Sequence, residues 1–448
     1  MENNEIDQGI NQMIDKTLNE IKTGDNSYDI GRVVGVESFI LRVIGLDDVM
    51  YYERVIVGEK TIGYVIGIEM NYVNVAILKL DGEVHIGDQV RQTREAFSGS
   101  FSNDAVGRMV NIFGYDTLNN KQFENLIPIE IESENVPIMD RTPVNRPLHT
   151  GILGVDLLFP IGKGQCQLVL GDSKTGKTQL CLDIIANQKD DDVICIYVAI
   201  GKSKKEVKEI YFELAQRGAM DKAIIVTAFN DDLPPVLALT PYYAVSIASK
   251  YMKEYGKDVL VVIDDLRRHA DAYREMSLLS QKAMGRDAYP TDIFFFHSRL
   301  LEKGCQYKNG GSLTILPIVE TKTSEITDYI STNVISITDG QIVLSAKNMQ
   351  QGIKPAINYG LSVSRLGGNV QKPEMRKMGA SLRGRLLSYL ESKDIYELAN
   401  SDQLSDNLKA RIAEGQQIVK TLTQPKWTNI TEAQAVEMFA SSVGANNG

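Results

Sequence analysis

The feature that most constrains this chain is a glycine-rich loop between an apolar strand and a helix. Residues 171–178 read Gly-Asp-Ser-Lys-Thr-Gly-Lys-Thr and match the pattern GxxxxGK[ST]. The glycines let backbone N–H groups turn inward around phosphate oxygens, and the helix N-terminus adds a favourable dipole. The alternative is a chance match in a glycine-rich turn, which the flanking strand and helix disfavour. The predicted nucleotide-binding residues are therefore Gly171, Asp172, Ser173, Lys174, Thr175, Gly176, Lys177 and Thr178.

Two side chains of this loop have specific expected roles. Lys177 should reach the outer phosphates of a bound nucleotide, and Thr178 should place its hydroxyl on Mg²⁺. A second apolar strand, residues 259–263, ends directly at Asp264 and Asp265. Asp264 lies where such sheets hold Mg²⁺ through its water shell. A strand-end aspartate that only caps a helix is the alternative, and the presence of the loop favours the metal role.

The residue pattern divides the chain into four segments. Residues 1–26 are predicted to form a helical arm, with an apolar stripe at helical spacing over 2–24. That stripe either packs on its own domain or contacts a partner protein. Residues 27–95 carry short β-branched runs separated by glycines, which predicts a small β-barrel or sandwich.

The remaining two segments differ in the spacing of their apolar residues. Between residues 96 and 375, continuous apolar strands alternate with helical stretches, which indicates a parallel sheet covered on both faces. Residues 376–448 read as helices over 378–398, 405–420 and 431–442, with Thr431 as the cap of the last. The predicted fold class is multidomain: a β-barrel, a central α/β domain and a helical C-terminal domain.

Composition limits the classes of function. The 448 residues are too many for one core and suggest about three domains. The chain shows no apolar run long enough to span a bilayer and no secretory signal at its start. Its net charge of −10 argues against a general nucleic-acid binder. Its four cysteines form no CxxC pair, so they are expected to be reduced, buried and apolar in a cytoplasmic protein.

Several segments in collinear order, over about residues 28–440, resemble the alpha subunit of F-type ATP synthases. They are far more specific than a phosphate loop, which many unrelated NTPases share. The segments that carry the resemblance are residues 160–165, 195–201, 289–302, 311–317, 332–341 and 360–368.

The resemblance implies an architecture and an assembly. Such subunits have a β-barrel, a RecA-like nucleotide domain and a helical domain, and they bind ATP or ADP with Mg²⁺. They alternate with catalytic beta subunits in a hexameric ring around a central rotor shaft. The implied location is cytoplasmic, peripheral to the inner face of the cell membrane through the complex. The arm at residues 2–24 would then suit a peripheral-stalk or adaptor protein.

One position separates catalytic from non-catalytic subunits in this family. Catalytic beta subunits use a glutamate shortly after the strand that follows the phosphate loop, and alpha subunits carry a glutamine there. This chain has Lys202. A protonated ammonium group cannot act as a general base, so we expect ATP to bind here without turnover. Lys202 would either contact the terminal phosphate or be a solvated surface lysine beside Lys204 and Lys205.

Arg365, in the segment Ser-Val-Ser-Arg, matches the family's arginine finger, which reaches into the neighbouring beta site. A guanidinium there stabilises the charge of the transferring phosphoryl group. Ser362 belongs to the same segment and is expected to support its geometry. The alternative for Arg365 is a structural pairing with a core carboxylate. Arg299, in another matched segment, is assigned an interface or structural role.

The chain departs from the family pattern at several positions. Ser173 and Lys174 replace the usual loop residues, which affects nucleotide preference or affinity more than the backbone cradle. Lys354 and Pro355 stand where the family has Arg-Pro near the adenine, and Gln424 is retained on the adenine side. Trp427 could stack near the base, but core packing is favoured for it.

The sequence also suggests a shortened C-terminal domain, since it stops soon after Phe439. That makes a specialised motor plausible, driving motility instead of proton transport. Two further hypotheses remain. One is a self-sufficient hexameric ATPase of the secretion or translocase type, against which Lys202 argues. The other is a structural subunit without nucleotide, against which the intact loop argues.

Overall fold

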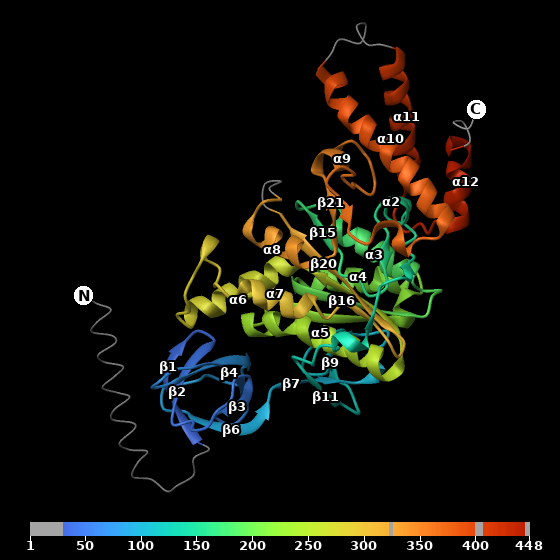
Figure 1. Cartoon of the computed structure of the whole chain (residues 1–448). Helices are drawn as coiled ribbons and strands as arrows, with labels where there is room; N and C mark the ends of the chain where they lie inside the picture. Colours follow the sequence, from blue (N-terminus) through green and yellow to red (C-terminus); the bar gives the residue numbers. More distant parts are fainter. Residues whose placement is uncertain (1–29, 322–325, 399–405, 444–448) are drawn as a thin grey trace.

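The computed structural model describes residues 30–321, 326–398 and 406–443 of the chain (Figure 1). The helix expected at residues 2–24 lies outside the described residues. A barrel, a central α/β domain and a set of C-terminal helices follow one another along the chain, which confirms the predicted fold class.

The barrel is closed, and all its neighbouring strands are antiparallel. Val33, Val43, Val55, Val65 and Val75 are almost completely buried inside it. Closure of the sheet removes the unpaired edges that a short open sheet would expose. In the spatial order β1-β2-β5-β4-β3-β6, the strands are β1 Ile30–Glu37, β2 Ile40–Ile44, β5 Val73–Lys79, β4 Thr61–Ile68, β3 Glu53–Val57 and β6 Gln89–Ala96.

The central domain is built on a sheet whose inner strands are parallel, in the order β8-β17-β16-β18-β20-β15-β21. These strands are β8 Met109–Val110, β17 Ala223–Phe229, β16 Val193–Lys202, β18 Asp258–Asp264, β20 Ser312–Glu320, β15 Leu168–Gly171 and β21 Gly340–Leu344. Shorter strands extend or flank the sheet: β7 Ser98–Phe101, β9 Tyr115–Asp116, β10 Lys121–Gln122, β11 Ile127–Glu130, β12 Arg141–Thr142, β13 Pro147–Leu148, β14 Ile161–Gly162, β19 Cys305–Tyr307 and β22 Val363–Ser364.

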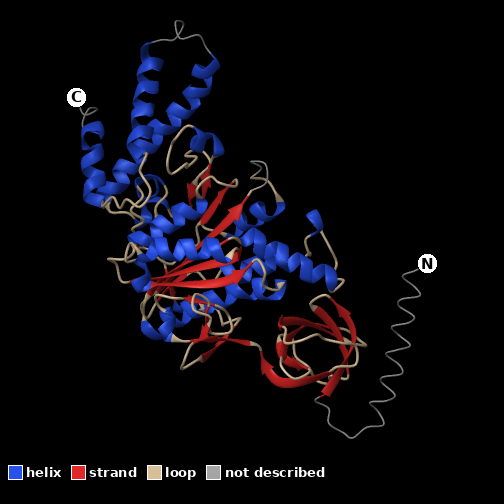
Figure 2. Ribbon diagram, turned by 180° about the vertical axis from the view of Figure 1, so that it is seen from behind, coloured by secondary structure: helices blue, strands red, loops and turns tan. Residues whose placement is uncertain are grey.

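Helices cover both faces of this sheet, as Figures 1 and 2 show. They are α2 Leu153–Leu158, α3 Lys177–Asn187, α4 Lys204–Ala215, α5 Pro234–Tyr255, α6 Leu266–Leu279, α7 Ile293–Leu301, α8 Tyr329–Ile337 and α9 Ala346–Gln350. Alternate residues of one strand enter two different cores. Ile196 and Val198 belong to the core that includes α5 and the barrel, and Cys195 and Tyr197 belong to the core that includes α3 and the C-terminal helices. This is why the inner strands read as continuous apolar runs.

The C-terminal helices are α10 Pro373–Leu398, α11 Asp406–Leu422 and α12 Glu432–Val443. Helix α10 begins five residues before the expected Met378, because Pro373 has no N–H to lose and suits a first helical position. Thr431 accepts a hydrogen bond from the N–H of Gln434, so it caps α12 as predicted.

All four cysteines are buried. Among the described helices, none has the length and apolar character of a membrane span.

Candidate nucleotide-binding site

The phosphate loop joins β15 to α3 at the carboxyl edge of the sheet. Gly176 adopts φ 91°, a left-handed conformation that a side chain would strain, and it directly precedes the first residue of α3. Ser173 and Lys174 are exposed at the tip of the loop. The loop therefore presents the start of a helix and its unpaired N–H groups to the solvent side of the sheet.

The interior of the loop is held by side chains. The carbonyl oxygen of Asp172 accepts hydrogen bonds from the Thr175 hydroxyl at 2.8 Å and the Lys177 ammonium at 2.5 Å. The Asp172 carboxylate accepts from Thr321 at 2.5 Å. Burial lowers the pKa of Lys177, although Glu320, 3.6 Å away, opposes that shift. Lys177 thus lies folded across the loop, where it can exchange these contacts for phosphate oxygens.

Asp264 meets the loop from β18. Its Oδ2 atom accepts hydrogen bonds from the hydroxyls of Thr178 at 2.6 Å and Tyr197 at 2.7 Å. A hydroxyl and a carboxylate at this spacing are oxygen donors of the kind that Mg²⁺ prefers. Asp265 follows and caps α6 by accepting from the N–H of Arg268. Burial, together with the Asp264 carboxylate, raises the pKa of Asp265 to about 6.

Lys202 lies inside this site and not in solvent. Its side chain is only 16% exposed, and its ammonium stands 3.2 Å from Asp264 Oδ2. The solvated-surface interpretation is therefore wrong for Lys202, whereas Lys204 and Lys205 are largely exposed. The donor set fits Mg²⁺ in its oxygen atoms, but it also contains a fixed cation on the carboxylate that would hold the metal.

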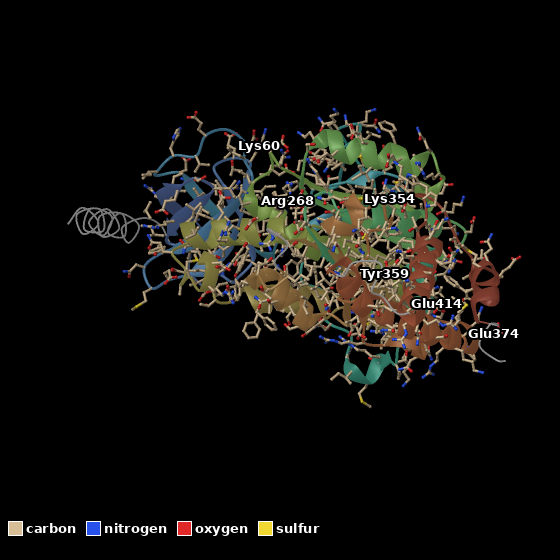
Figure 3. All side chains as sticks on the ribbon, turned by 90° about the horizontal axis from the view of Figure 1, so that it is seen from above. Lys60, Arg268, Lys354, Tyr359, Glu374 and Glu414 are labelled. Carbon is tan, nitrogen blue, oxygen red and sulfur yellow. The ribbon has the colours of Figure 1, made fainter. Side chains whose placement is uncertain are left out.

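A cavity of about 450 Å³ adjoins the loop on the side of the C-terminal helices. It brings together Thr175, Gly176, Lys354, Pro355 and Gln424, which sequence reasoning had assigned to one nucleotide. Seen from above, Lys354 lies toward the C-terminal helices and Arg268 toward the barrel (Figure 3). The cavity is open to the loop and has mainly apolar walls, as a base-binding site requires.

Sequence reasoning missed several wall residues of this cavity, among them Met349, Leu180 and Asp183. Asp183 is seven residues after Gly176, so helical spacing from the loop would have placed it on the facing side of α3. Burial raises the pKa of Asp183, and its carboxylate accepts from Gln179 at 2.7 Å and from the N–H of Trp427 at 3.1 Å.

Gln424 contributes to the cavity by positioning the chain around it. Its amide oxygen accepts from the N–H of Leu153, and its amide nitrogen donates to the carbonyls of Gly151 and Thr428. The ring of Trp427 lies 3.8 Å from the guanidinium of Arg217 and lines no wall of the cavity. Trp427 is therefore a packing residue.

Arg365 lies apart from this site. It is exposed at the end of β22, donates to the carbonyl of Ile335 at 3.2 Å and forms no ion pair within the described part of the chain. Ser362 is buried, donates to the carbonyl of Asn358 and accepts from the N–H of Val343. These bonds tie the segment that carries Arg365 to β21.

Arg299 has a structural contact. Its guanidinium pairs with Glu132 at 3.2 Å, beside Tyr52 of the barrel. It therefore lies at the joint between the barrel and the central domain, which agrees with the interface or structural role assigned to it.

A closed barrel, a parallel sheet with a phosphate loop and a helical end define a multidomain nucleotide-binding protein of the P-loop class. The profile of the ATP synthase alpha/beta family, nucleotide-binding domain, matches residues 151–364. The sodium-ion-specific ATP synthase subunit alpha of Acetobacterium woodii is 39% identical over 439 residues, which cover 97% of this chain and 86% of that protein. The chain belongs to the alpha subunits of the F-type ATP synthase family.

Proposed function

We propose that this chain is the non-catalytic, ATP-binding member of an alternating hexameric ring and supplies Arg365 to the catalytic sites of neighbouring beta-type subunits. The observation that carries the first half is Lys202. Lys202 stands in the sequence where the resemblance puts the catalytic glutamate of beta subunits, and its ammonium, paired with Asp264 at 3.2 Å, cannot act as a general base.

The geometry of Arg365 supports the second half. Within the described residues, the Arg365 guanidinium makes one hydrogen bond, to a backbone carbonyl, so it is available to a neighbouring subunit, and the bonds of Ser362 hold its segment in place. The planar fork of arginine suits the spread charge of a transferring phosphoryl group. Within this proposal, the chain binds ATP or ADP through residues 171–178, with Lys354, Pro355 and Gln424 around the base.

Mg²⁺ that accompanies the nucleotide would meet the Thr178 hydroxyl and, through water, Asp264, where it would compete with the Lys202 ammonium. The further partners we propose are a central rotor shaft and, through residues 2–24, a peripheral or adaptor protein. The complex would lie at the membrane without a nucleic-acid partner. The relative is named sodium specific; proton transport and motility are both proposals for what this ring drives.

The finger is tested on the ring purified with its beta-type partner. Arg365→Ala should lower ATP hydrolysis by about 10³–10⁵-fold, because the phosphoryl charge loses its guanidinium. Nucleotide bound to this subunit, measured after gel filtration, should be unchanged. Arg32→Ala, at an exposed arginine of the barrel, is the matched control and should leave turnover unchanged.

Two outcomes would contradict the proposal. Equal turnover of the Arg365→Ala ring and the parent ring would remove the finger. Steady hydrolysis by the purified chain without a beta-type partner would show a self-sufficient ATPase instead.

A further inference from the structure

One carboxylate oxygen of Asp264 is surrounded by hydrogen-bond donors. Its Oδ2 atom is within 3.2 Å of three donors: the hydroxyls of Thr178 and Tyr197 and the ammonium of Lys202. Asp264 itself is 2% exposed, so solvent does not screen these contacts. In P-loop NTPases, an aspartate at this position holds a divalent ion through its bound water. Here a protein cation already pairs with it.

The backbone fixes Lys202 in this place. Strand β16 pairs with β18 through Ala199 opposite Asp264, so Lys202 lies three residues past that pair. The register between β16 and β17 is irregular after Ile200, and Gly201 adopts φ 61°. This irregularity turns the end of the strand, and the side chain of Lys202 reaches back to Asp264.

Neighbouring contacts hold the turn. The carbonyl of Lys202 accepts from the N–H of Asn230 at 3.1 Å, and the carbonyl of Gly201 accepts from the guanidinium of Arg268. Ser203 then begins α4 with a capping box. Lys202 is therefore anchored on both sides, and its ammonium is a positioned charge.

The charges of the site follow from this placement. Lys177 faces Glu320, and Lys202 faces Asp264, so both of these lysines have a carboxylate partner. The attraction between a divalent ion and a carboxylate falls when that carboxylate is already neutralised. Conversely, an ammonium beside the loop can meet phosphate oxygens as a point charge, as the loop lysine does.

We propose that Lys202 acts as a built-in cation of this nucleotide site, so that the chain binds ATP with little dependence on Mg²⁺. The inference rests on the nucleotide site of the proposed function and adds a residue that determines its metal requirement. It distinguishes this subunit's site from sites in which Mg²⁺ supplies most of the positive charge around the terminal phosphates.

The test measures ATP affinity of the full chain by calorimetric titration, once with Mg²⁺ and once with EDTA. For the parent chain, we expect the two Kd values to agree within about threefold. For Lys202→Gln, which keeps a polar side chain one bond shorter but loses the charge, EDTA should weaken binding by about tenfold or more. Lys205→Gln, the same change at a lysine that is 87% exposed, should behave as the parent.

A second measurement needs no variant. Mn²⁺ titrated into the ATP-loaded chain and followed by electron paramagnetic resonance should bind more weakly than it binds to free ATP. Thermal unfolding without nucleotide establishes that Lys202→Gln is folded.

Four results would overturn the inference. They are an equally large Mg²⁺ dependence in the parent and in Lys202→Gln, an equal independence in both, tight Mn²⁺ binding by the parent complex, and no ATP binding in either buffer. The last would also remove the nucleotide site of the proposed function. Unchanged turnover of the Arg365→Ala ring would remove the finger alone and leave this inference standing.

Discussion

Asp258 begins β18, the strand whose other end carries Asp264. Its carboxylate takes two hydrogen bonds from Arg146, at 2.7 and 3.0 Å, one from Lys163 at 2.9 Å and one from Ser312 at 2.8 Å. Burial opposes ionisation, but these donors outweigh it and hold the pKa of Asp258 below its ordinary value. The group is therefore ionised and paired at neutral pH.

Asp258→Asn should lower the free energy of unfolding by about 2–4 kcal/mol near neutral pH, because two cations lose their buried partner. A depressed folded-state pKa contributes stability above the unfolded pKa, and that stability is lost as the pH falls through the folded value. The difference between parent and variant should therefore shrink below about pH 4. Urea denaturation at a series of pH values measures it.

Asp192→Asn is the matched control for this prediction. Asp192 pairs with Lys257 at 2.8 Å but is 78% exposed, so its loss should cost less than about 1 kcal/mol. A stability difference for Asp258→Asn that stays constant from neutral to acidic pH would contradict the assignment.

At the scale of elements, the segment between α11 and α12 closes the base cavity through Gln424. That side chain is 5% exposed, and its amide forms hydrogen bonds with backbone groups of residues 151, 153 and 428. Gln424→Ala would leave a buried N–H and carbonyls without partners, which costs about 2–3 kcal/mol. We expect this loss in the nucleotide-free chain, together with weaker ATP binding.

Thermal unfolding with and without ATP separates positioning from direct contact. Gln416→Ala, at an exposed glutamine of α11, is the control and should change neither quantity. A variant at Gln424 that lost affinity with unchanged nucleotide-free stability would instead indicate direct recognition of the base.

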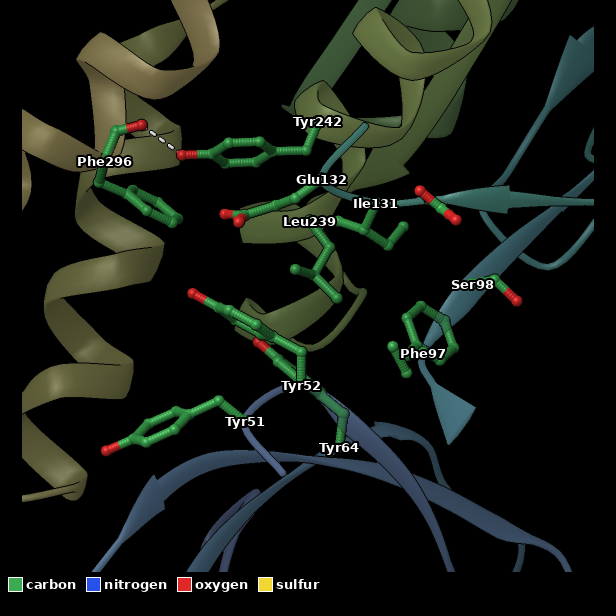
Figure 4. A pocket seen from close by; sticks show the side chains of 12 residues that line it. Tyr51, Tyr52, Tyr64, Phe97, Ser98, Ile131, Glu132, Leu239, Tyr242 and Phe296 are labelled. Carbon is green, nitrogen blue, oxygen red and sulfur yellow. Dashed lines mark hydrogen bonds between the residues drawn. The ribbon is translucent and has the colours of Figure 1, made fainter. Parts of the chain in front are cut away.

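At the scale of the whole molecule, the barrel and the central domain share one continuous apolar core. Phe97, between β6 and β7, is 7% exposed and lies beside a cavity of about 210 Å³ at the joint. Tyr64 of the barrel and Leu239 and Tyr242 of α5 line the same cavity, and the Tyr242 hydroxyl donates to the carbonyl of Phe296 (Figure 4). This packing predicts that the two domains unfold together.

Phe97→Ala should destabilise the chain by about 3–4 kcal/mol, because it enlarges a cavity that the neighbouring rings cannot fill. It should also split a single calorimetric transition into two, since the barrel loses an apolar contact at its joint with the sheet domain. Phe295→Ala, at a ring that is 66% exposed, should shift stability by less than about 0.5 kcal/mol. A single transition retained by Phe97→Ala would contradict this view of the joint.

Most of the fold could be predicted from the local pattern of apolar residues in the sequence. The inner strands were recognisable because residues such as Val259 to Ile263 form a continuous apolar run, and the barrel because its strands are short β-branched runs separated by glycines. The contacts of Gln424 and Trp427 were out of reach, because their partners Leu153 and Asp183 are more than two hundred residues away. Only the folded chain brings such groups together.

The sequence by itself determined the phosphate loop and the three-part architecture, because both depend on interactions between residues close in the chain. It also placed a lysine at position 202 but left open where its side chain points. The tertiary structure decided that question: the turn at Gly201 and the pairing of β16 with β18 bring the ammonium to Asp264. A charge acts on what lies within a few ångströms of it, and that neighbourhood exists only in the folded chain.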